Sequence, residues 1–448
     1  MATRIIQARQ IYPRVKRLGR EFFWIGLGQA VAAIAGIVGV RLLTGALSPS
    51  KYGELALGMT VATLANQVIL APLSGAFLRF FAPAQQVNQT SAYLRGVLLL
   101  LIQATCLLLG VACLFALGLW MSGRTEWLWL IFAALIFSLL SGYKAALDGI
   151  QNAARQRAIV AWHQGLGEWL RFLTAAAMIA LLGAFSFVAM AGYALATLVV
   201  IVSQLIFFRR KVFRFKLLPM SVSRFEINQS EVQKWVGQMR VYAWPFTSWG
   251  LFTWAQVASD RWALQTFGST SAVGLYAVLY QLGYYPIMLM SITVTQLASP
   301  VLFSRAGDGT DPERLNQTHQ LNNWIVLSSI VLSIFGFIMA LFFHHEVFVI
   351  LVSPEYQSVS PLLPLMVLSG GLFAAGQLAV QSKLMTFDTR SLMVPKIVTA
   401  SLGILLNFAG AYAFGLRGVV FANVSFSAIY FLWILYLTRM KAQKACPV

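Results

Sequence analysis

The sequence predicts an all-α polytopic membrane protein with twelve transmembrane helices in two six-helix bundles. Of its 448 residues, 59% are hydrophobic and only 10% are charged, a composition outside the range of soluble globular domains. The apolar residues also fall into long segments that reach the about 20 residues needed to cross the hydrocarbon core of a bilayer. Because a chain in lipid must satisfy its own backbone hydrogen bonds, we expect each segment to be a helix.

Twelve apolar segments follow one another along the chain. They cover approximately 21–43, 53–80, 93–119, 127–147, 158–182, 186–208, 242–266, 272–303, 320–343, 361–383, 394–414 and 418–438. The first exceeds the about 7–15 apolar residues of a typical signal peptide, so we expect it to be retained as a helix.

The longest polar stretch, residues 209–240, divides the segments six and six. We therefore predict an N-terminal bundle over 1–208, a cytoplasmic linker over 209–240 and a C-terminal bundle over 241–448. Because six is an even number, both bundles begin on the same side of the membrane. This predicts a pseudo-twofold axis along the membrane normal, with a central cavity between the bundles.

A short repeat supports two related halves. Arg41-Leu42-Leu43 is followed by Tyr52-Gly53-Glu54-Leu55-Ala56, and Arg261 is followed at nearly the same spacing by Gly274-Leu275-Tyr276-Ala277. The second copy lies in a stretch that begins at Trp244-Pro245. We interpret this stretch as the start of the second repeat.

The net charge of +19 comes from 33 Lys and Arg against 14 Asp and Glu. The basic residues gather in alternate polar breaks between the apolar segments, as the positive-inside rule requires. This distribution predicts a multi-pass protein with both termini in the cytoplasm. Since no basic face with interleaved aromatics forms, we expect no nucleic-acid partner.

Four charged residues lie at membrane depth, away from the ends of their apolar segments: Glu168 and Arg171 in the fifth, and Asp260 and Arg261 in the seventh. A charge at membrane depth costs roughly 2.5–3.5 kcal/mol on insertion scales, so these residues are functional candidates. Glu168 and Arg171 are three residues apart and share a helix face. The alternative to a functional role is that they form a structural ion pair with each other. Asp260 and Arg261 project about 100° apart, so we expect different targets for them, with snorkelling as the alternative for Arg261.

No other chemistry is indicated. The four histidines show no metal-ligand spacing, and no phosphate-cradling Gly-x-x-x-x-Gly-Lys-Ser/Thr loop occurs. The longest outward loop, about 344–360, is too short for a soluble catalytic domain. We therefore predict no cofactor and no enzyme activity.

Several short motifs resemble the polysaccharide (oligosaccharide) flippase family of the multidrug/oligosaccharidyl-lipid/polysaccharide exporter superfamily. They are Arg41-Leu42-Leu43, Leu47-Ser48-Pro49-Ser50-Lys51-Tyr52-Gly53, Arg79-Phe80, Pro245, Ser259-Asp260-Arg261, Val273-Gly274-Leu275-Tyr276-Ala277 and Ser353-Pro354-Glu355-Tyr356. The resemblance spans the chain from the first apolar segment to the twelfth.

The resemblance implies a flippase of the bacterial inner membrane that works by alternating access. Its substrate would be an undecaprenyl-pyrophosphate-linked oligosaccharide repeat unit, moved from the cytoplasmic to the outer leaflet for surface or exopolysaccharide synthesis. The expected partners are this lipid-linked oligosaccharide, membrane lipids, a coupling ion (proton or sodium) and polysaccharide assembly proteins. The alternatives are a cation-coupled multidrug or metabolite exporter of the same superfamily, and a membrane-embedded glycosyltransferase or ligase, which the short outward loops disfavour.

A pyrophosphate substrate requires fixed cations, because the arginine guanidinium binds phosphate oxygens in pairs. Our candidates for substrate binding are Arg41, Arg79, Lys144, Arg171 and Arg261. Snorkelling is the alternative for Arg41, and positive-inside anchoring is the alternative for Arg79 and Lys144. The candidates for ion coupling are the carboxylates of Glu168 and Asp260, since a buried carboxylate can change its charge during transport.

Overall fold

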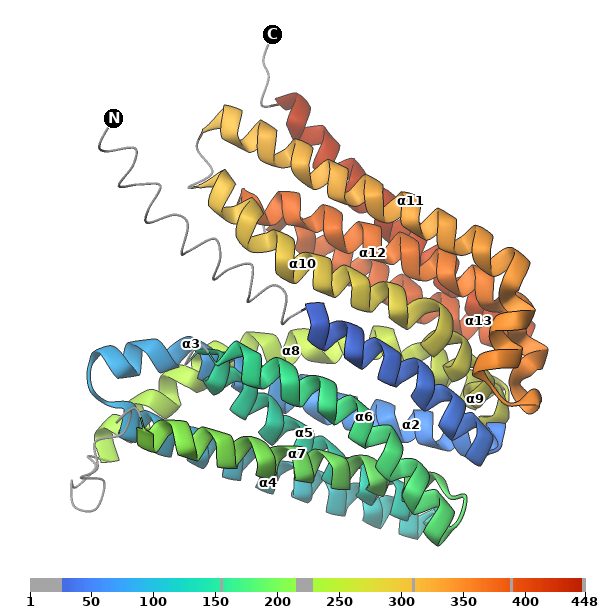
Figure 1. Ribbon diagram of the computed structural model, residues 1–448, viewed down its shortest axis with the longest axis horizontal. Coiled ribbons are helices and arrows are strands. Elements are labelled where there is room, and N and C mark those ends of the chain that lie inside the picture. Colours follow the sequence, from blue (N-terminus) through green and yellow to red (C-terminus); the bar gives the residue numbers. More distant parts are fainter. Residues whose placement is uncertain (1–25, 154–155, 215–228, 308–310, 387–389, 445–448) are drawn as a thin grey trace. The chain divides into compact units, whose positions relative to one another are not determined.

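The structure is a computed structural model that describes residues 26–153, 156–214, 229–307, 311–386 and 390–444. In this described part of the chain the secondary structure is entirely helical (Figure 1). The first helix spans Gly26–Ala46. It is followed by α2 (Pro49–Ala65), η1 (Asn66–Leu70), α3 (Ala71–Gln86), α4 (Thr90–Met121), η2 (Thr125–Trp127), α5 (Leu128–Ala153), α6 (Arg157–Leu182) and α7 (Ser186–Arg214). The second part of the chain contains α8 (Gln229–Phe267), α9 (Thr270–Leu279), η3 (Tyr280–Tyr284), α10 (Tyr285–Ala306), α11 (Pro312–Leu351), η4 (Pro354–Leu362), α12 (Leu363–Met385), η5 (Arg390–Leu392) and α13 (Met393–Lys444).

Ten helical stretches of the described residues are long and apolar enough to cross a membrane. They correspond to every predicted segment except 242–266, and the last two predicted segments fall in α13, in which two helices meet at a kink at Gly415. The predicted segment 242–266 lies within the 39-residue helix α8. The hydropathy of this segment is low because it contains Asp260 and Arg261 and several Ser, Thr, Gln and Trp residues. The polytopic all-α fold is therefore confirmed, whereas the count of twelve spans stays a prediction.

Helix breaks fall where the local sequence requires them. Gly415 has φ +58° within α13, between the predicted segments 394–414 and 418–438, and this conformation favours glycine. Near this break, Gly410 and Gly418 bring their backbones into contact, with no room for a Cβ on either residue. At the start of α9, the Ser269 side chain accepts a hydrogen bond from the Ala272 N–H (3.1 Å), which is a typical N-cap.

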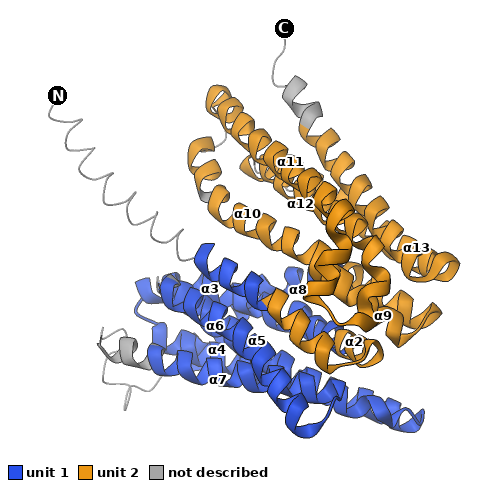
Figure 2. Cartoon of the chain, turned by 45° about the vertical axis from the view of Figure 1, so that its right-hand side comes forward, with its two compact units in different colours: residues 1–35, 58–254 blue, residues 36–57, 255–448 orange. Residues whose placement is uncertain are grey.

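The chain forms two compact units (Figure 2). Unit 1 contains the residues up to Ala35 and Gly58–Trp254; unit 2 contains Gly36–Leu57 and the residues from Ala255 onward. The end of the first helix and the start of α2 thus belong with the C-terminal helices, and the first part of α8 belongs with the N-terminal helices. These units differ from the predicted bundles 1–208 and 241–448 at both places. Of the predicted linker 209–240, residues 209–214 and 229–240 are helical, and 215–228 lie outside the described residues.

Within unit 2, the two copies of the sequence repeat contact each other. A Cβ on Gly53 would strike the Thr270 carbonyl oxygen, and a Cβ on Gly274 would strike the Pro49 carbonyl oxygen. Pro49 precedes Gly53 by the same four residues by which Thr270 precedes Gly274. This reciprocity is what a local twofold relation between the two copies produces. The axis along the membrane normal stays a prediction.

Candidate functional site

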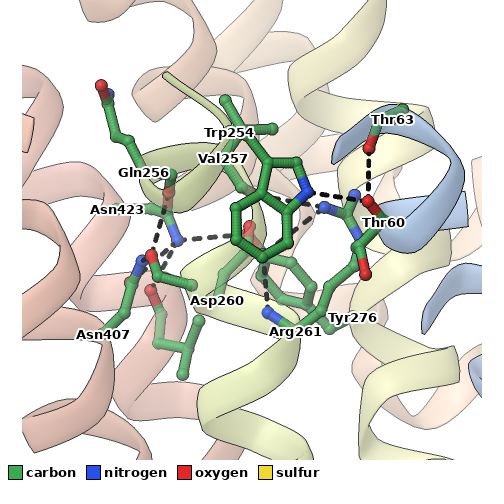
Figure 3. A network of polar contacts seen from close by, with 12 residues as sticks. Thr60, Thr63, Trp254, Gln256, Val257, Asp260, Arg261, Tyr276, Asn407 and Asn423 are labelled. Atoms are coloured by element: carbon green, nitrogen blue, oxygen red, sulfur yellow. Dashed lines mark hydrogen bonds and ion pairs between the residues drawn. The ribbon is translucent and has the colours of Figure 1, made fainter. Parts of the chain in front are cut away.

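A buried carboxylate in unit 2, that of Asp260 on α8, is the centre of a polar network (Figure 3). Asp260 is 3% exposed. The Tyr276 hydroxyl on α9 donates a hydrogen bond to Asp260 Oδ2 (2.6 Å). The Arg261 backbone N–H donates to Oδ1 (2.6 Å), and the Arg261 guanidinium Nη1 lies 3.4 Å from the same oxygen. Both carboxylate oxygens are therefore engaged by groups of the protein.

The network continues into α13 and returns to α8. The Asn423 amide donates to the Tyr276 hydroxyl (3.1 Å) and approaches Asn407 Oδ1 (3.4 Å). The Asn407 amide donates to Ser259 Oγ (2.9 Å), and Ser259 Oγ donates in turn to the Gln256 carbonyl oxygen (2.9 Å). Three helices thus share one chain of hydrogen bonds, which holds the side chains in fixed positions.

The local sequence explains this assembly. Ser259-Asp260-Arg261 is an uninterrupted part of α8. Gly274, which lies two residues before Tyr276, brings the backbone of α9 into close contact with that of α2. The two asparagines come from either side of the break at Gly415, so that α13 contributes one amide from each arm. Buried polar side chains in a membrane helix require partners of this kind.

The structure corrects the expectation that Asp260 and Arg261 have different targets. The arginine side chain is long enough to turn back along α8, where its Nη1 reaches both Asp260 and the Val257 carbonyl oxygen (3.2 Å). The guanidinium carbon lies 4.7 Å from the Tyr280 ring centroid and 6.0 Å from that of Tyr276, which is a cation–π arrangement. The Arg261 side chain is 12% exposed, so it packs on rings rather than extending away from the helix.

Glu168 and Arg171 form an ion pair on α6, with 2.7 Å between Arg171 Nη2 and Glu168 Oε2. The guanidinium carbon of Arg171 lies 4.7 Å from the Phe172 ring centroid and 5.2 Å from that of Tyr193. The Glu168 side chain is 31% exposed and the Arg171 side chain is 23% exposed. The three-residue spacing predicts this ion pair. The contact agrees with the alternative that Glu168 and Arg171 have a structural role.

Lys144 on α5 also has a carboxylate partner, because its Nζ lies 2.8 Å from Asp148 Oδ2. The Gln204 amide of α7 donates to Asp148 Oδ1 (2.5 Å) and to Gln151 Oε1 (2.7 Å). Asp148 was not among the predicted site residues. Asp148 directly follows the predicted segment 127–147, and a charged residue at such a position is typical of an ordinary helix end.

The two remaining candidates, Arg41 and Arg79, are exposed. The Arg41 guanidinium donates to the Val352 carbonyl oxygen, next to a contact in which the Tyr356 hydroxyl donates to the Leu47 carbonyl oxygen (2.7 Å). Among the described residues, Arg79 on α3 has no hydrogen-bond or ion-pair partner. The five predicted substrate-binding cations therefore have different surroundings, and three of them are paired with carboxylates.

Sequence reasoning missed Tyr276, Asn407 and Asn423 as members of the site. Tyr276 belongs to a quoted motif, but it carried no predicted role. The two asparagines lie inside apolar segments, where a polar amide is expensive, and this was the signal that could have identified them. The sequence does not show which carboxylate their hydrogen bonds lead to, because this depends on contacts between segments that are distant in the sequence.

The network offers the chemistry of an ion site. One carboxylate, two amide oxygens and two hydroxyls are oxygen donors, the ligand type that hard cations prefer, and a carboxylate also takes up protons. Among the described residues, no group of three His, Cys, Asp or Glu side chains suits a transition metal.

Long apolar helices that could cross a membrane, together with a buried and charged polar network, define a polytopic membrane protein. The chain belongs to the polysaccharide biosynthesis protein family, whose profile matches residues 18–306. The family resemblance inferred from the sequence motifs is thereby confirmed. A search of curated proteins found no match.

Solved structures of transporters share the fold. A lipid II flippase, MurJ, in an inward closed conformation, matches with a TM-score of 0.69 at 12% identity, over 93% of this chain and 87% of that chain. An inward-facing multidrug resistance MATE family transporter of the MOP superfamily matches with a TM-score of 0.64 at 13% identity, over 93% and 96%. The Vibrio cholerae MATE transporter VcmN matches with a TM-score of 0.60 at 12% identity, over 96% and 98%. At these identities the likeness concerns the fold alone.

Proposed function

We propose that the protein is a flippase for undecaprenyl-pyrophosphate-linked oligosaccharide repeat units, which it moves from the cytoplasmic to the outer leaflet of the bacterial inner membrane. The observation that carries this proposal is the match to the polysaccharide biosynthesis protein family over residues 18–306. The likeness to a lipid II flippase supports it, because a fold of this kind accommodates a lipid carrier. The product would serve surface or exopolysaccharide synthesis, with polysaccharide assembly proteins as further partners.

Asp260 is the proposed ion-coupling residue. Its carboxylate is buried, and oxygen donors from Ser259, Tyr276, Asn407 and Asn423 lie in its network. A proton or sodium ion at this carboxylate would cancel the charge that attracts Arg261. The guanidinium would then be available to phosphate oxygens. Ion binding and substrate binding would thus be coupled through one adjacent pair of residues.

The cations differ in how readily they would meet a pyrophosphate group. Arg41 and Arg79 are exposed, so a phosphate can approach them without displacing a carboxylate. Lys144 and Arg171 are neutralised by Asp148 and Glu168 at 2.7–2.8 Å, so anion binding there would have to separate an ion pair. We therefore rank Arg41 and Arg79 first. Arg261 comes next, because an ion at Asp260 would release its guanidinium, and Lys144 and Arg171 come last. The positive-inside distribution supports cytoplasmic termini.

The test is translocation by the purified full-length protein in reconstituted vesicles. Undecaprenyl pyrophosphate that carries a labelled oligosaccharide is incorporated into both leaflets, and its movement is followed by the accessibility of the glycan to an external enzyme. The proposal predicts protein-dependent movement of this lipid. Export of organic cations, with no movement of any pyrophosphate-linked glycan, would instead identify a drug exporter.

A further inference from the structure

A pocket of about 320 Å³ lies within unit 1, between the π-helical turn η1, the start of α3 and the middle of α8. It is lined by Gln67, Ala71, Pro72, Gly75, Tyr242, Phe246, Trp249, Gly250 and Thr253. The pocket thus combines three aromatic rings with several polar groups, as small-molecule sites do. None of the predicted ion-coupling or substrate-binding residues lines it.

The aromatic side of the pocket is a single face of α8. Tyr242, Phe246 and Trp249 are spaced four and three residues apart, so they lie one above the other on the helix. The rings of Tyr242 and Phe246 have centroids 5.3 Å apart, and Phe80 packs edge-on against Tyr242 at 5.8 Å. Phe246 is 47% exposed and Trp249 38% exposed. The contacts orient two of these rings, and substantial aromatic surface remains uncovered.

The opposite side of the pocket includes Gln67, a residue whose side-chain oxygen is a buried hydrogen-bond acceptor. Gln67 belongs to η1, a π-helical turn between α2 and α3, and such turns frequently occur at functional sites. Gly250 lies against the Gln67 carbonyl oxygen, so that α8 and η1 approach as closely as their backbones allow. Gln67 Oε1 is buried, and it has no hydrogen-bond partner among the described residues. A buried acceptor without a donor is costly, so rotation of the Gln67 side chain toward a ligand hydroxyl in the pocket would be stabilising.

We propose that this pocket is a subsite for a sugar ring of the transported glycan. A pyranose has an apolar C–H face that stacks on an aromatic ring and equatorial hydroxyls that donate hydrogen bonds, so it matches both sides of the pocket. A lipid chain would cover the rings but leave Gln67 Oε1 without a donor. The glycan class of the ligand rests on the proposed function, whereas the ring-and-acceptor geometry does not.

The experiment compares the binding of two probes to the purified full-length protein in detergent micelles. One is undecaprenyl pyrophosphate that carries a trisaccharide of hexoses and N-acetylhexosamine; the other is undecaprenyl pyrophosphate without sugar. We expect the wild-type protein to bind the glycan probe about tenfold more tightly, as one favourable ring contact and one hydrogen bond allow. Trp249→Ala and Phe246→Ala should reduce this affinity ratio to about one, and Trp249→Phe should retain most of the preference for the glycan probe.

Trp244→Ala is the matched control, because Trp244 lies on the same helix, is 71% exposed and does not line the pocket. It should keep the wild-type ratio. A wild-type ratio near one, an unchanged ratio in Trp249→Ala, or an equal loss of both probes would overturn the glycan subsite. Translocation is measured separately in vesicles: glycan preference without translocation would contradict the proposed flippase function but retain the subsite.

Discussion

Two pairs of opposite charges lie within the predicted membrane segments, and they differ in their connections. Glu168 and Arg171 contact each other at 2.7 Å within one turn of α6 and are partly exposed. Asp260 and Arg261 make a longer contact of 3.4 Å on α8 and are more deeply buried. Asp260 is in addition bonded to Tyr276, which connects it to Asn423 of α13.

The difference shows that a charge at membrane depth does not by itself identify a coupling site. Glu168 and Arg171 neutralise each other locally, so a change at one is felt chiefly by the other. A change of charge at Asp260 reaches three helices, because their side chains share its hydrogen bonds. We therefore propose a structural role for the first pair and the coupling role for the second.

The largest expected effect follows from removing one carboxylate from each pair. Asp260→Ala leaves the buried Arg261 without its counter-charge and should lower the free energy of unfolding by about 3–5 kcal/mol. Glu168→Ala should lower it by about 1 kcal/mol, because Arg171 is more exposed. Unfolding of each variant in mixed micelles measures both values. Equal losses would remove the distinction between the pairs.

A smaller effect is expected from the hydroxyl that links Asp260 to α13. Tyr276→Phe removes the donor to Asp260 Oδ2 and the acceptor of the Asn423 amide, and it should cost about 1–2 kcal/mol. Tyr280→Phe is the control, because it keeps the ring beneath the Arg261 guanidinium and should change stability by less than about 0.5 kcal/mol. The same micelle titration distinguishes them, and a loss in Tyr280→Phe alone would argue against the network.

The smallest effect is the coupling energy between Glu168 and Arg171. A double-mutant cycle with Glu168→Gln and Arg171→Gln should give about 0.5 kcal/mol, the range of partly exposed pairs three residues apart on a helix. Unfolding of the two single variants and the double variant provides the number. A coupling energy of several kcal/mol would show that this pair, too, is a buried network element.

Much of the fold follows from composition and segment length alone. The predicted segment 158–182 coincides closely with α6, and the break between 394–414 and 418–438 falls at Gly415. The start of α8 at Gln229, ahead of the predicted 242, could not be found in this way. Its first part is polar, and a helix that packs one face on protein need not be apolar all round.

The site could be predicted only in part. The insertion cost of a charge identifies Asp260 and Arg261, because that cost depends on the residue and its segment. The roles of Tyr276 and Asn423 depend on the packing of α9 and α13 against α8, which no local pattern encodes. The mutual contact of Asp260 and Arg261 was missed because Cβ directions do not describe the reach of an arginine side chain.

The most direct test of the coupling site is ion-driven translocation of the lipid-linked oligosaccharide in vesicles containing wild-type protein, Asp260→Asn or Glu168→Gln. A proton or sodium gradient should accelerate the wild-type protein and Glu168→Gln to similar extents. Asp260→Asn keeps an acceptor for Tyr276 but loses the titratable charge, so its rate should not respond to either gradient. A gradient response in Asp260→Asn equal to that of the wild-type protein would contradict the coupling role of Asp260.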